Sequence, residues 1–409
     1  MPDRTVDYLL IGGGIAAGNC ARWLREEGAD GSILLVGREN DAPYNRPPLS
    51  KKYLTGESGR EDAMFRDASW WGEQDIELLT RTSVMKLDSG ERVAKLSTKE
   101  EVGFDKALIA TGANVRRLRG EGSDLEGIHY LRAFGNSDAI RADVENAECA
   151  VMIGGSYIGC EVAASLTQKG VSTSVLMQEE VPLERSFGAD VARFFEGVLA
   201  EHGVSLVTQD EFERFEGADG RVTKVVTAGG KELPCDLVVV GVGVMPDVML
   251  ARGAGLDLGE AGGVRCSARL ESSAEGIYAA GDMCEYDSVL HGRPIRLEHW
   301  DVAFNHGKTA ALNMLGRAVD HDVVPYFFSD LADWASMEYV GPGTGEPVLR
   351  GSMDDGEFTA FYVDGGKVRA ALTVGRSDDL DHARRFIAED VDARREHLAD
   401  TGTDLGAIN

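Results

Sequence analysis

The first residues whose types and spacing point to chemistry are three small residues after an apolar run near the N-terminus. Residues 8–11 predict a buried parallel strand, and Gly12, Gly14 and Ala17 follow it in the pattern GxGxxA. Glycines at such a turn let the backbone approach a pyrophosphate, which the N–H groups and dipole of the next helix attract. The pattern therefore predicts a phosphate-binding turn.

The residues around this turn complete a nucleotide-binding unit. Small and apolar residues recur at helical spacing from Ala17 to Leu24, and Gly28 is a natural helix end. A second apolar strand at 33–36 leads to Glu39, an acid that can bind ribose hydroxyls. Because strand, glycines, helix, strand and acid occur in this order, we expect a dinucleotide to bind here.

A second unit of the same kind occupies the stretch CAVMIGGSYIGCEVAASLTQKGVSTSVLMQEE. Gly154, Ser156 and Gly159 take the glycine positions, so the middle glycine is replaced by a serine. The serine adds a Cβ where the backbone approaches phosphate, although its hydroxyl can donate a hydrogen bond to one. Two dinucleotide units in one chain suggest one site for a flavin and one for a nicotinamide.

The acid of the second unit favours NADH as the nicotinamide. Glu179 follows the second strand and would repel the 2′-phosphate of NADPH, and the first arginine after this strand is Arg185. However, Met177 occupies the position at which an acid that binds the ribose is expected, so NADPH stays an alternative donor.

Length and composition limit the class of protein. With 409 residues, the chain is long enough for two or three domains. No stretch approaches the ~20 uninterrupted apolar residues of a membrane span. The N-terminus enters an apolar strand at once, which leaves no room for a leader peptide. We therefore expect a cytoplasmic protein.

The charge balance argues against two classes of partner. The formal net charge is −27, with 69 acidic and 42 basic residues. Nucleic acids and anionic membranes both require basic surface, so we expect neither as a partner.

The cysteines indicate neither a metal site nor a redox disulfide. The six cysteines have no CxxC pair and no spacing typical of metal ligands. We expect reduced core thiols and no bound metal.

Three further strand ends carry glycine turns. The first ends in Ala110, Thr111 and Gly112, and the second leads through Gly243 into a proline. The third is EGIYAAGDMCEY, in which Gly281 and Asp282 suit the polar ribityl-phosphate part of FAD.

In this order, the motifs resemble those of the pyridine nucleotide-disulfide oxidoreductase superfamily, whose flavoproteins have two dinucleotide-binding domains. The stretches YNRPPLSKKYL and RLEHWDVAFNHGKTAALNMLG are similar to those of the ferredoxin-reductase type of FAD/NAD(P)H oxidoreductase, which includes putidaredoxin and rubredoxin reductases and apoptosis-inducing factor. The resemblance covers nearly the whole chain.

The C-terminal segment also fits this family. After VPYFFSDLADW, residues 364–366 (Asp-Gly-Gly) predict a hairpin turn. A final helix is expected from about Ser377, with Leu380, Ala383, Ile387 and Val391 on one face.

The resemblance implies an α/β fold with two Rossmann-like, three-layer domains of the glutathione-reductase type and a small C-terminal α+β domain. The expected FAD domain comprises residues 1–113 and 243–322, the NAD(P) domain residues 114–242, and the C-terminal domain residues 323–409.

The resemblance also implies a role for the loop PYNRPPLSKKYLTG, which composition alone describes as a stiff surface connection. Lys51 would lie near the reactive N5 of the flavin and pair with Glu161, and both are expected to be catalytic. A lysine there stabilises negative charge on the reduced flavin, and the glutamate holds the lysine. A glutamate near a helix start also suits the dipole without a catalytic role.

The motifs and the resemblance together predict two sets of binding residues. For FAD they are Gly12, Gly14, Ala17, Glu39, Arg46, Pro47, Lys51, Ala110, Thr111, Gly112, Gly281, Asp282, Glu298, His299 and Trp300. For NAD they are Gly154, Ser156, Ile158, Gly159, Glu161, Glu179 and Gly243. Trp300 is either a lid over the flavin or a core tryptophan.

The implied activity is that of an FAD-dependent NAD(P)H oxidoreductase that takes a hydride onto flavin N5. Because the chain lacks a cysteine pair, electrons would pass to an external acceptor, with a ferredoxin or rubredoxin as the leading candidate. The alternatives are small acceptors (quinone, monodehydroascorbate or dioxygen) and an NADH-sensing role like that of apoptosis-inducing factor. The state of assembly, monomer or homodimer, stays open.

An acidic ferredoxin would require a basic docking face. Arg384, Arg385, Arg394 and Arg395 lie in the C-terminal helical region and could supply one, although a solvated helix face explains them as well.

Overall fold

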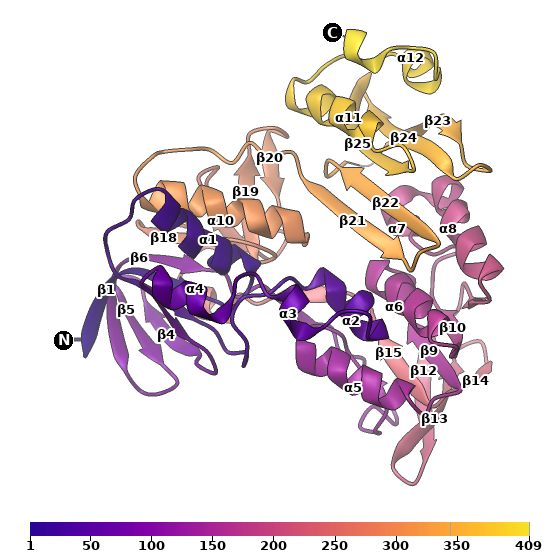
Figure 1. Cartoon of the computed structure of the whole chain (residues 1–409), viewed down its shortest axis with the longest axis horizontal. Helices are drawn as coiled ribbons and strands as arrows, with labels where there is room; N and C mark the ends of the chain where they lie inside the picture. The colour runs from indigo at the N-terminus through magenta and orange to yellow at the C-terminus, as the bar shows by residue number, and fades with distance from the viewer. Residues whose placement is uncertain (344, 409) are drawn as a thin grey trace. The chain divides into compact units, whose positions relative to one another are not determined.

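The computed structural model of the protein describes residues 1–343 and 345–408, and the chain forms two compact units (Figure 1). The first unit comprises residues 1–45, 60–114 and 245–325. The second comprises residues 46–59, 115–244 and 326–409, so the loop that carries Lys51 belongs to it. The three-domain division expected from the sequence stays a prediction.

A parallel sheet forms the centre of the first unit. Its strand order is β3-β2-β1-β6, and β18 pairs with the end of β6. An antiparallel hairpin, β4 and β5, is added at the start of β6. The bounds are β1 (Arg4–Ile11), β2 (Ile33–Val36), β3 (Ile76–Leu79), β4 (Val84–Asp88), β5 (Val93–Leu96), β6 (Glu101–Ile109) and β18 (Ile277–Ala279). All four residues of β2 are buried, as expected of a strand covered on both faces.

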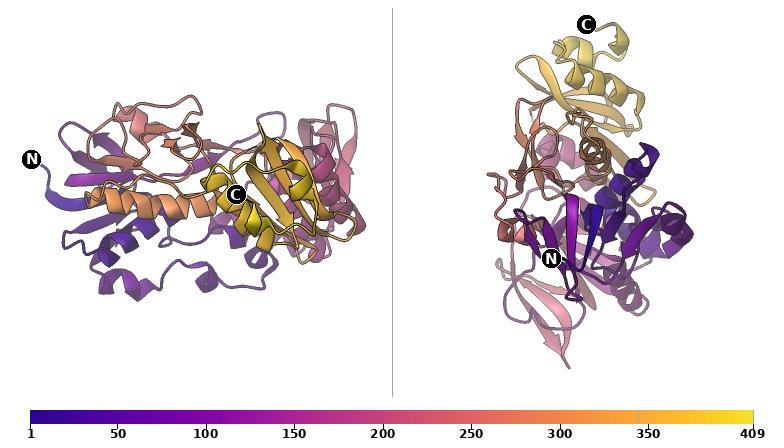
Figure 2. Two further views of the ribbon diagram at one scale, coloured as in Figure 1. Left: turned by 90° about the horizontal axis from the view of Figure 1, so that it is seen from above. Right: turned by 90° about the vertical axis from the view of Figure 1, so that its left-hand side faces the viewer.

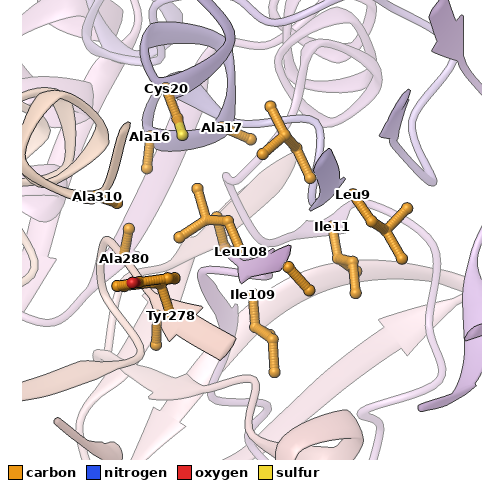
Figure 3. Packing of buried hydrophobic residues seen from close by; sticks show 14 of the residues in the cluster. Leu9, Ile11, Ala16, Ala17, Cys20, Leu108, Ile109, Tyr278, Ala280 and Ala310 are labelled. Atoms are coloured by element: carbon orange, nitrogen blue, oxygen red, sulfur yellow. The ribbon is translucent and has the colours of Figure 1, made fainter. Parts of the chain in front are cut away.

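Two helices pack closely together beside this sheet, α1 (Ile15–Glu26) and α10 (Trp300–Met314) (Figures 1 and 3). Figure 3 shows Ala16, Ala17 and Cys20 of α1 near Leu108 of the sheet and Ala310 of α10. A Cβ at Gly307 would lie only 2.4 Å from the Ala16 carbonyl oxygen. The small residues are therefore needed for the two helices to approach.

The remaining elements of the first unit are short. They are α3 (Arg60–Ala63), α4 (Ala68–Glu73), α9 (Met249–Gly253), β17 (Val264–Cys266), β19 (Cys284–Ser288) and β20 (Arg293–Ile295). The strands β17, β19 and β20 form a separate small sheet. The chain passes between the units within β7 (Ala113–Val115) and β16 (Val244–Pro246).

The second unit contains another parallel sheet, with the strand order β11-β10-β9-β15-β8. The strands are β8 (Ile128–His129), β9 (Cys149–Ile153), β10 (Ser172–Leu176), β11 (Ser205–Val207) and β15 (Leu237–Val240). Its helices are α2 (Lys52–Thr55), α5 (Phe134–Val144), α6 (Tyr157–Gln168), α7 (Glu184–Phe187) and α8 (Ala189–Glu201), with the 3-10 helix η1 at Pro47–Ser50. A three-stranded antiparallel sheet comprises β12 (Phe212–Ala218), β13 (Arg221–Thr227) and β14 (Glu232–Pro234).

The C-terminal part is an antiparallel sheet against which α11 (Asp378–Ala388) packs, as Figures 1 and 2 show in orange to yellow. The strand order is β21-β22-β25-β24-β23, so β21 is an edge strand. The strands are β21 (Tyr326–Leu331), β22 (Ala335–Val340), β23 (Glu346–Ser352), β24 (Glu357–Asp364) and β25 (Lys367–Val374). The chain ends with α12 (Arg395–Ala399) and η2 (Leu405–Ala407).

The local predictions for this part are right with two exceptions, the first being that α11 is followed by α12 and is therefore not the final helix. Gly365 and Gly366 form the two-residue hairpin turn, both with positive φ. Ser377 is the N-cap of α11. Val391 is buried but lies beyond the helix, because the helix ends at Ala388 and Asp390 has a φ of 51°. Placing Val391 on the helical face was therefore wrong.

No helix among residues 1–343 and 345–408 combines the length and apolarity needed to cross a membrane. The six cysteines are free thiols, and all except Cys149 are buried.

Acid is expected to destabilise the first unit through its buried histidines. His321 is 3% exposed, its Nδ1 lies 2.9 Å from Thr309 Oγ1, and desolvation by burial lowers its pKa to about 4. In the unfolded chain the pKa is about 6.5. The unfolded state therefore binds more protons, and stability is lost as the pH falls from about 6.5 towards 4, by roughly 3 kcal/mol for this residue.

The measurement is the free energy of unfolding of the wild type and of His321→Gln between pH 7.5 and pH 4.5. The wild type should lose stability more steeply than the variant, because glutamine does not titrate. Parallel loss in the two proteins would contradict the prediction.

Candidate active site

The first glycine turn of the first unit has the geometry of a phosphate cradle. Gly12 has a φ of +131°, and a Cβ there would lie 2.1 Å from the Ala110 carbonyl oxygen. At Gly14, the N-cap of α1, a Cβ would meet no atom within 4 Å, so the start of the helix faces open space. The first turn carries no acidic residue, and no described side chain caps the helix. This is the environment that a pyrophosphate requires.

The predicted strand-end turns of the first unit are fixed by hydrogen bonds. Thr111 Oγ1 donates to the Asp247 carbonyl over 2.7 Å, and the Asp247 N–H donates to the Gly112 carbonyl over 2.8 Å. The predicted ribose ligand, the half-buried Glu39, accepts a 2.6 Å hydrogen bond from the Tyr44 hydroxyl. Tyr44 thus orients the acid, which the sequence did not indicate.

The Gly281–Asp282 turn is held by a buried histidine of α10. Gly281 has a φ of +77°, and its N–H donates to His306 Nδ1 over 3.2 Å. The N-cap of α10 is His299. Desolvation by burial lowers the pKa of His299 to about 4, against the opposing effect of the Asp282 carboxylate. His299 is therefore neutral at pH 7 and can act as a donor or an acceptor.

Trp300, at the first position of α10, is held by two contacts in the first unit. Its Nε1–H donates to Asn45 Oδ1 over 3.1 Å, and its ring stacks on Phe304 with centroids 5.2 Å apart. The half-buried ring is thus fixed in place, which is compatible with both predicted roles, a lid over the flavin and a core tryptophan.

The first unit therefore has a geometry that fits a dinucleotide such as FAD. The turn at Gly12 permits close backbone approach, the helix start at Gly14 is open, and the turns at Thr111 and Gly281 are rigid. Ala17 lies fully buried on the helix behind the turn. Of the predicted FAD residues, Arg46, Pro47 and Lys51 lie in the second unit.

The second glycine turn repeats this geometry in the second unit. Gly154 has a φ of +110°, and a Cβ there would lie 2.4 Å from the Gly241 carbonyl oxygen. A Cβ at Gly159 would lie 1.9 Å from the Gly154 carbonyl oxygen. Ser156 is exposed, and its hydroxyl donates to the Gly241 carbonyl over 3.0 Å instead of capping α6. The serine is thus compatible with an open helix start, and the turn fits a dinucleotide.

The predicted ribose acid of this second turn is paired. Glu179 forms an ion pair with Arg185, whose side chain is 75% exposed. Arg185 Nη2 also lies 3.4 Å from Gln178 Oε1. A guanidinium therefore lies beside the acid that was expected to favour NADH over NADPH. Ile158 and Gly243, also predicted for NAD, lie in the same unit, and Ile158 is 40% exposed.

Lys51 and Glu161, which the family resemblance pairs, form an ion pair with Lys51 Nζ 3.0 Å from Glu161 Oε1. Glu161 is 4% exposed and lies on α6, while Lys51 follows η1. Ser50 donates to Glu161 Oε2 over 2.5 Å, and Ser329 donates to Oε1 over 2.6 Å. Lys51 Nζ also lies 3.7 Å from Asp330 Oδ2. The catalytic role of the pair stays a prediction.

Sequence reasoning missed Ser50, Ser329 and Asp330. Ser329 lies 168 positions from Glu161 along the chain, and no local pattern marks it. The stretch FFSDLADW supported the family resemblance but did not indicate which of its side chains reaches α6.

The four C-terminal arginines do not form an available basic face. Arg384 and Arg385 lie on α11 and contact Asp381 and Glu389, while Arg394 and Arg395 begin α12 and contact Glu396 and Glu346. These ion pairs favour the interpretation that the four arginines belong to a solvated helix face and not to a docking surface. Within the described residues, no group of His, Cys, Asp and Glu could hold a metal ion.

Comparison with known proteins extends these observations. Residues 6–307 match the pyridine nucleotide-disulphide oxidoreductase family, and residues 326–409 match the reductase C-terminal domain. The chain is 32% identical over 402 residues to rhodocoxin reductase of Rhodococcus erythropolis, covering 98% of this chain and 93% of the relative.

Two crystal structures are similar over nearly their whole length. The ferredoxin reductase of the CYP199A2 system of Rhodopseudomonas palustris has a TM-score of 0.94 and 31% identity, with 98% of both chains covered. A covalent putidaredoxin reductase–putidaredoxin complex has a TM-score of 0.93 and 30% identity, covering 98% of this chain and 97% of that chain. The predicted fold class, α/β with a C-terminal α+β domain, is confirmed. The chain therefore belongs to the pyridine nucleotide-disulphide oxidoreductase family, and within it to the ferredoxin-reductase type.

Proposed function

We propose that this protein is an FAD-dependent NAD(P)H oxidoreductase that delivers electrons to a ferredoxin. The main observation in support is the pair of glycine turns, each of which is followed by an open helix start. In addition, the chain resembles, over nearly its whole length, a reductase whose structure was solved in a covalent complex with putidaredoxin. When bound, FAD supplies a two-electron acceptor for the nicotinamide and a one-electron donor for the acceptor protein.

In this proposal the two units have separate tasks. Gly12, Gly14 and the turns at Thr111 and Gly281 hold FAD, while Gly154 and Gly159 hold the nicotinamide dinucleotide. Lys51 and Glu161 act in flavin reduction, where the ammonium stabilises negative charge and the carboxylate holds the ammonium. The shortest contacts of the pair, from Ser50 and Ser329, keep it in one geometry.

The test of the acceptor is turnover with NADH and a [2Fe–2S] ferredoxin, a rubredoxin or a quinone, each in excess. The proposal predicts that the ferredoxin is reduced at a rate at least tenfold above the quinone, with a KM that depends on ionic strength. Equal or faster reduction of the quinone would support a reductase of small acceptors instead.

We further propose that NADH is the preferred donor. Glu179 lies after β10, where an acid meets the adenosine ribose in this fold. Its partner Arg185 limits this preference for NADH, because the guanidinium can reorient and bind the 2′-phosphate of NADPH.

Replacing Glu179 by Gln is expected to shift the donor preference towards NADPH. The variant loses the acid that repels a 2′-phosphate and releases Arg185 to bind it. We expect the ratio of kcat/KM for NADPH to kcat/KM for NADH to rise roughly tenfold or more, about 1.4 kcal/mol. Glu180→Gln is the matched control, because Glu180 pairs with Arg193 instead. An unchanged ratio, or an equal rise in the control, would contradict the assignment.

We also propose a cytoplasmic location. The six cysteines are free thiols, as is usual in the reducing cytoplasm.

A further inference from the structure

We propose that Ser329, on the first strand of the C-terminal sheet, is a positioning residue for flavin reduction that acts through Glu161. The inference rests on the proposed function, because it assumes that the Lys51–Glu161 pair takes part in that reaction. It gives the C-terminal domain a part in the reaction through a single hydroxyl group.

Lys51, Ser50 and Ser329 contact the Glu161 carboxylate, and these contacts divide between its two oxygens. Oε1 lies 2.6 Å from Ser329 Oγ and 3.0 Å from Lys51 Nζ, whereas Oε2 lies 2.5 Å from Ser50 Oγ. Donors on both oxygens fix the rotation of the carboxylate plane as well as its position. Hydrogen bonds to an ionised group are also stronger than neutral ones.

Ser329 is the donor that does not move with the lysine. Ser50 precedes Lys51 directly in the chain, so any shift of this loop displaces both of their contacts together. Ser329 comes from β21 and is 1% exposed, and its hydroxyl points onto α6 from a separate element. It therefore holds Glu161 from an element separate from the loop that carries Lys51.

The neighbours of Ser329 on β21 contact the lysine. The Phe328 ring centroid lies 4.9 Å from Lys51 Nζ, and Asp330 Oδ2 lies 3.7 Å from it. Asp330 is itself held by a 2.7 Å hydrogen bond from Ser336 on β22. Three consecutive residues of β21 thus contact the ion pair, Phe328 and Asp330 at the lysine and Ser329 at the glutamate.

The turn that follows β21 has further contacts with helices of the second unit. Gln168, at the end of α6, donates to Asp333 over 2.9 Å, and His202 stacks on Trp334 with centroids 4.1 Å apart. These contacts hold the end of β21 through the turn that follows it, without the Ser329 hydroxyl. Removing that hydroxyl should therefore loosen Glu161 while leaving the strand in place.

The experiment measures flavin reduction by NADH in a stopped-flow instrument under anaerobic conditions. The proteins are the wild type, Ser329→Ala, Ser329→Thr, Glu161→Gln and the Ser329→Ala/Glu161→Gln double variant. Each gives a limiting rate and a Kd for NADH, together with FAD content and a melting temperature. Ser288→Ala is the control, because it removes another buried serine hydroxyl, which contacts His291 in the first unit.

We expect Ser329→Ala to lower the limiting rate roughly tenfold with little change in Kd for NADH, since a misplaced group mainly affects the reaction step. Ser329→Thr, which keeps the hydroxyl, should recover most of the rate. In the Glu161→Gln background, Ser329→Ala should have almost no further effect, because the residue acts through Glu161. The control should keep the wild-type rate.

Two results would overturn the inference while leaving the proposed function intact. One is a Ser329→Ala variant that melts earlier but reduces its flavin at the wild-type rate. The other is an equal loss of rate with and without Glu161. If Glu161→Gln itself reduces flavin normally, the proposed role of the ion pair fails, and the Ser329 inference fails with it. Should Ser329→Ala not fold, Ser329→Cys, with a weaker donor of similar size, takes its place.

Discussion

Replacing Lys51 by Met is expected to slow flavin reduction by NADH about 100-fold, or roughly 2.7 kcal/mol in the barrier. Methionine keeps much of the volume of the side chain but removes the ammonium that lies 3.0 Å from Glu161. The negative charge that develops on reduction then lacks its stabilising partner. The measurement is the limiting rate of flavin bleaching in anaerobic stopped-flow experiments.

Lys52→Met is the matched control, because Lys52 is the next residue in the chain and is exposed. The control should reduce its flavin at the wild-type rate. Lys51→Met also leaves Glu161 buried without its counter-ion, which can cost about 3 kcal/mol of stability. FAD content and melting temperature therefore accompany each rate. A folded Lys51→Met protein with full FAD content and an unchanged rate would exclude the proposed role.

Replacing Gly14 by Ala is expected to weaken the binding of FAD without unfolding the protein. Gly14 has a φ of −95°, which alanine adopts without strain, and the added methyl group would meet no protein atom within 4 Å. It would instead occupy the open space at the start of α1, where the pyrophosphate is proposed to lie. We expect the affinity for FAD to fall at least tenfold, about 1.4 kcal/mol or more.

FAD affinity is measured by titrating the apoprotein with FAD and following the quenching of flavin fluorescence, with the melting temperature of the apoprotein as the check on folding. Gly253→Ala, on α9, is the control, because its Cβ would also meet no atom within 4 Å. Gly12→Ala should differ from both, since its Cβ would lie 2.1 Å from the Ala110 carbonyl oxygen and destabilise the fold. If Gly14→Ala binds FAD with wild-type affinity, the pyrophosphate does not lie at the start of α1.

The parts of the fold that local rules govern were predictable from the sequence. The strand, glycine turn and helix from Tyr8 to Leu24 are where the apolar periodicity and the glycine pattern placed them, because each depends on residues close together in the chain. The hairpin at Gly365 and Gly366 was predictable for the same reason. The helix end before Val391 was not, because Asp390 adopts a positive φ without being a glycine.

The contacts that complete the candidate site are not local, and the sequence therefore did not reveal them. Ser329 and Glu161 meet only because β21 packs against α6. Likewise, the sequence showed Arg185 and Glu179 but not that they form an ion pair. The Lys51–Glu161 contact was expected from the family resemblance, and the structure contains it.

The most direct test of the account is an anaerobic titration of the purified protein with NADH, followed by addition of an oxidised [2Fe–2S] ferredoxin. We expect a flavin absorption band that one equivalent of NADH bleaches, and that returns as two equivalents of ferredoxin are reduced. A protein that binds no flavin after incubation with FAD, or whose NADH-reduced flavin does not pass electrons to any ferredoxin offered, would contradict it.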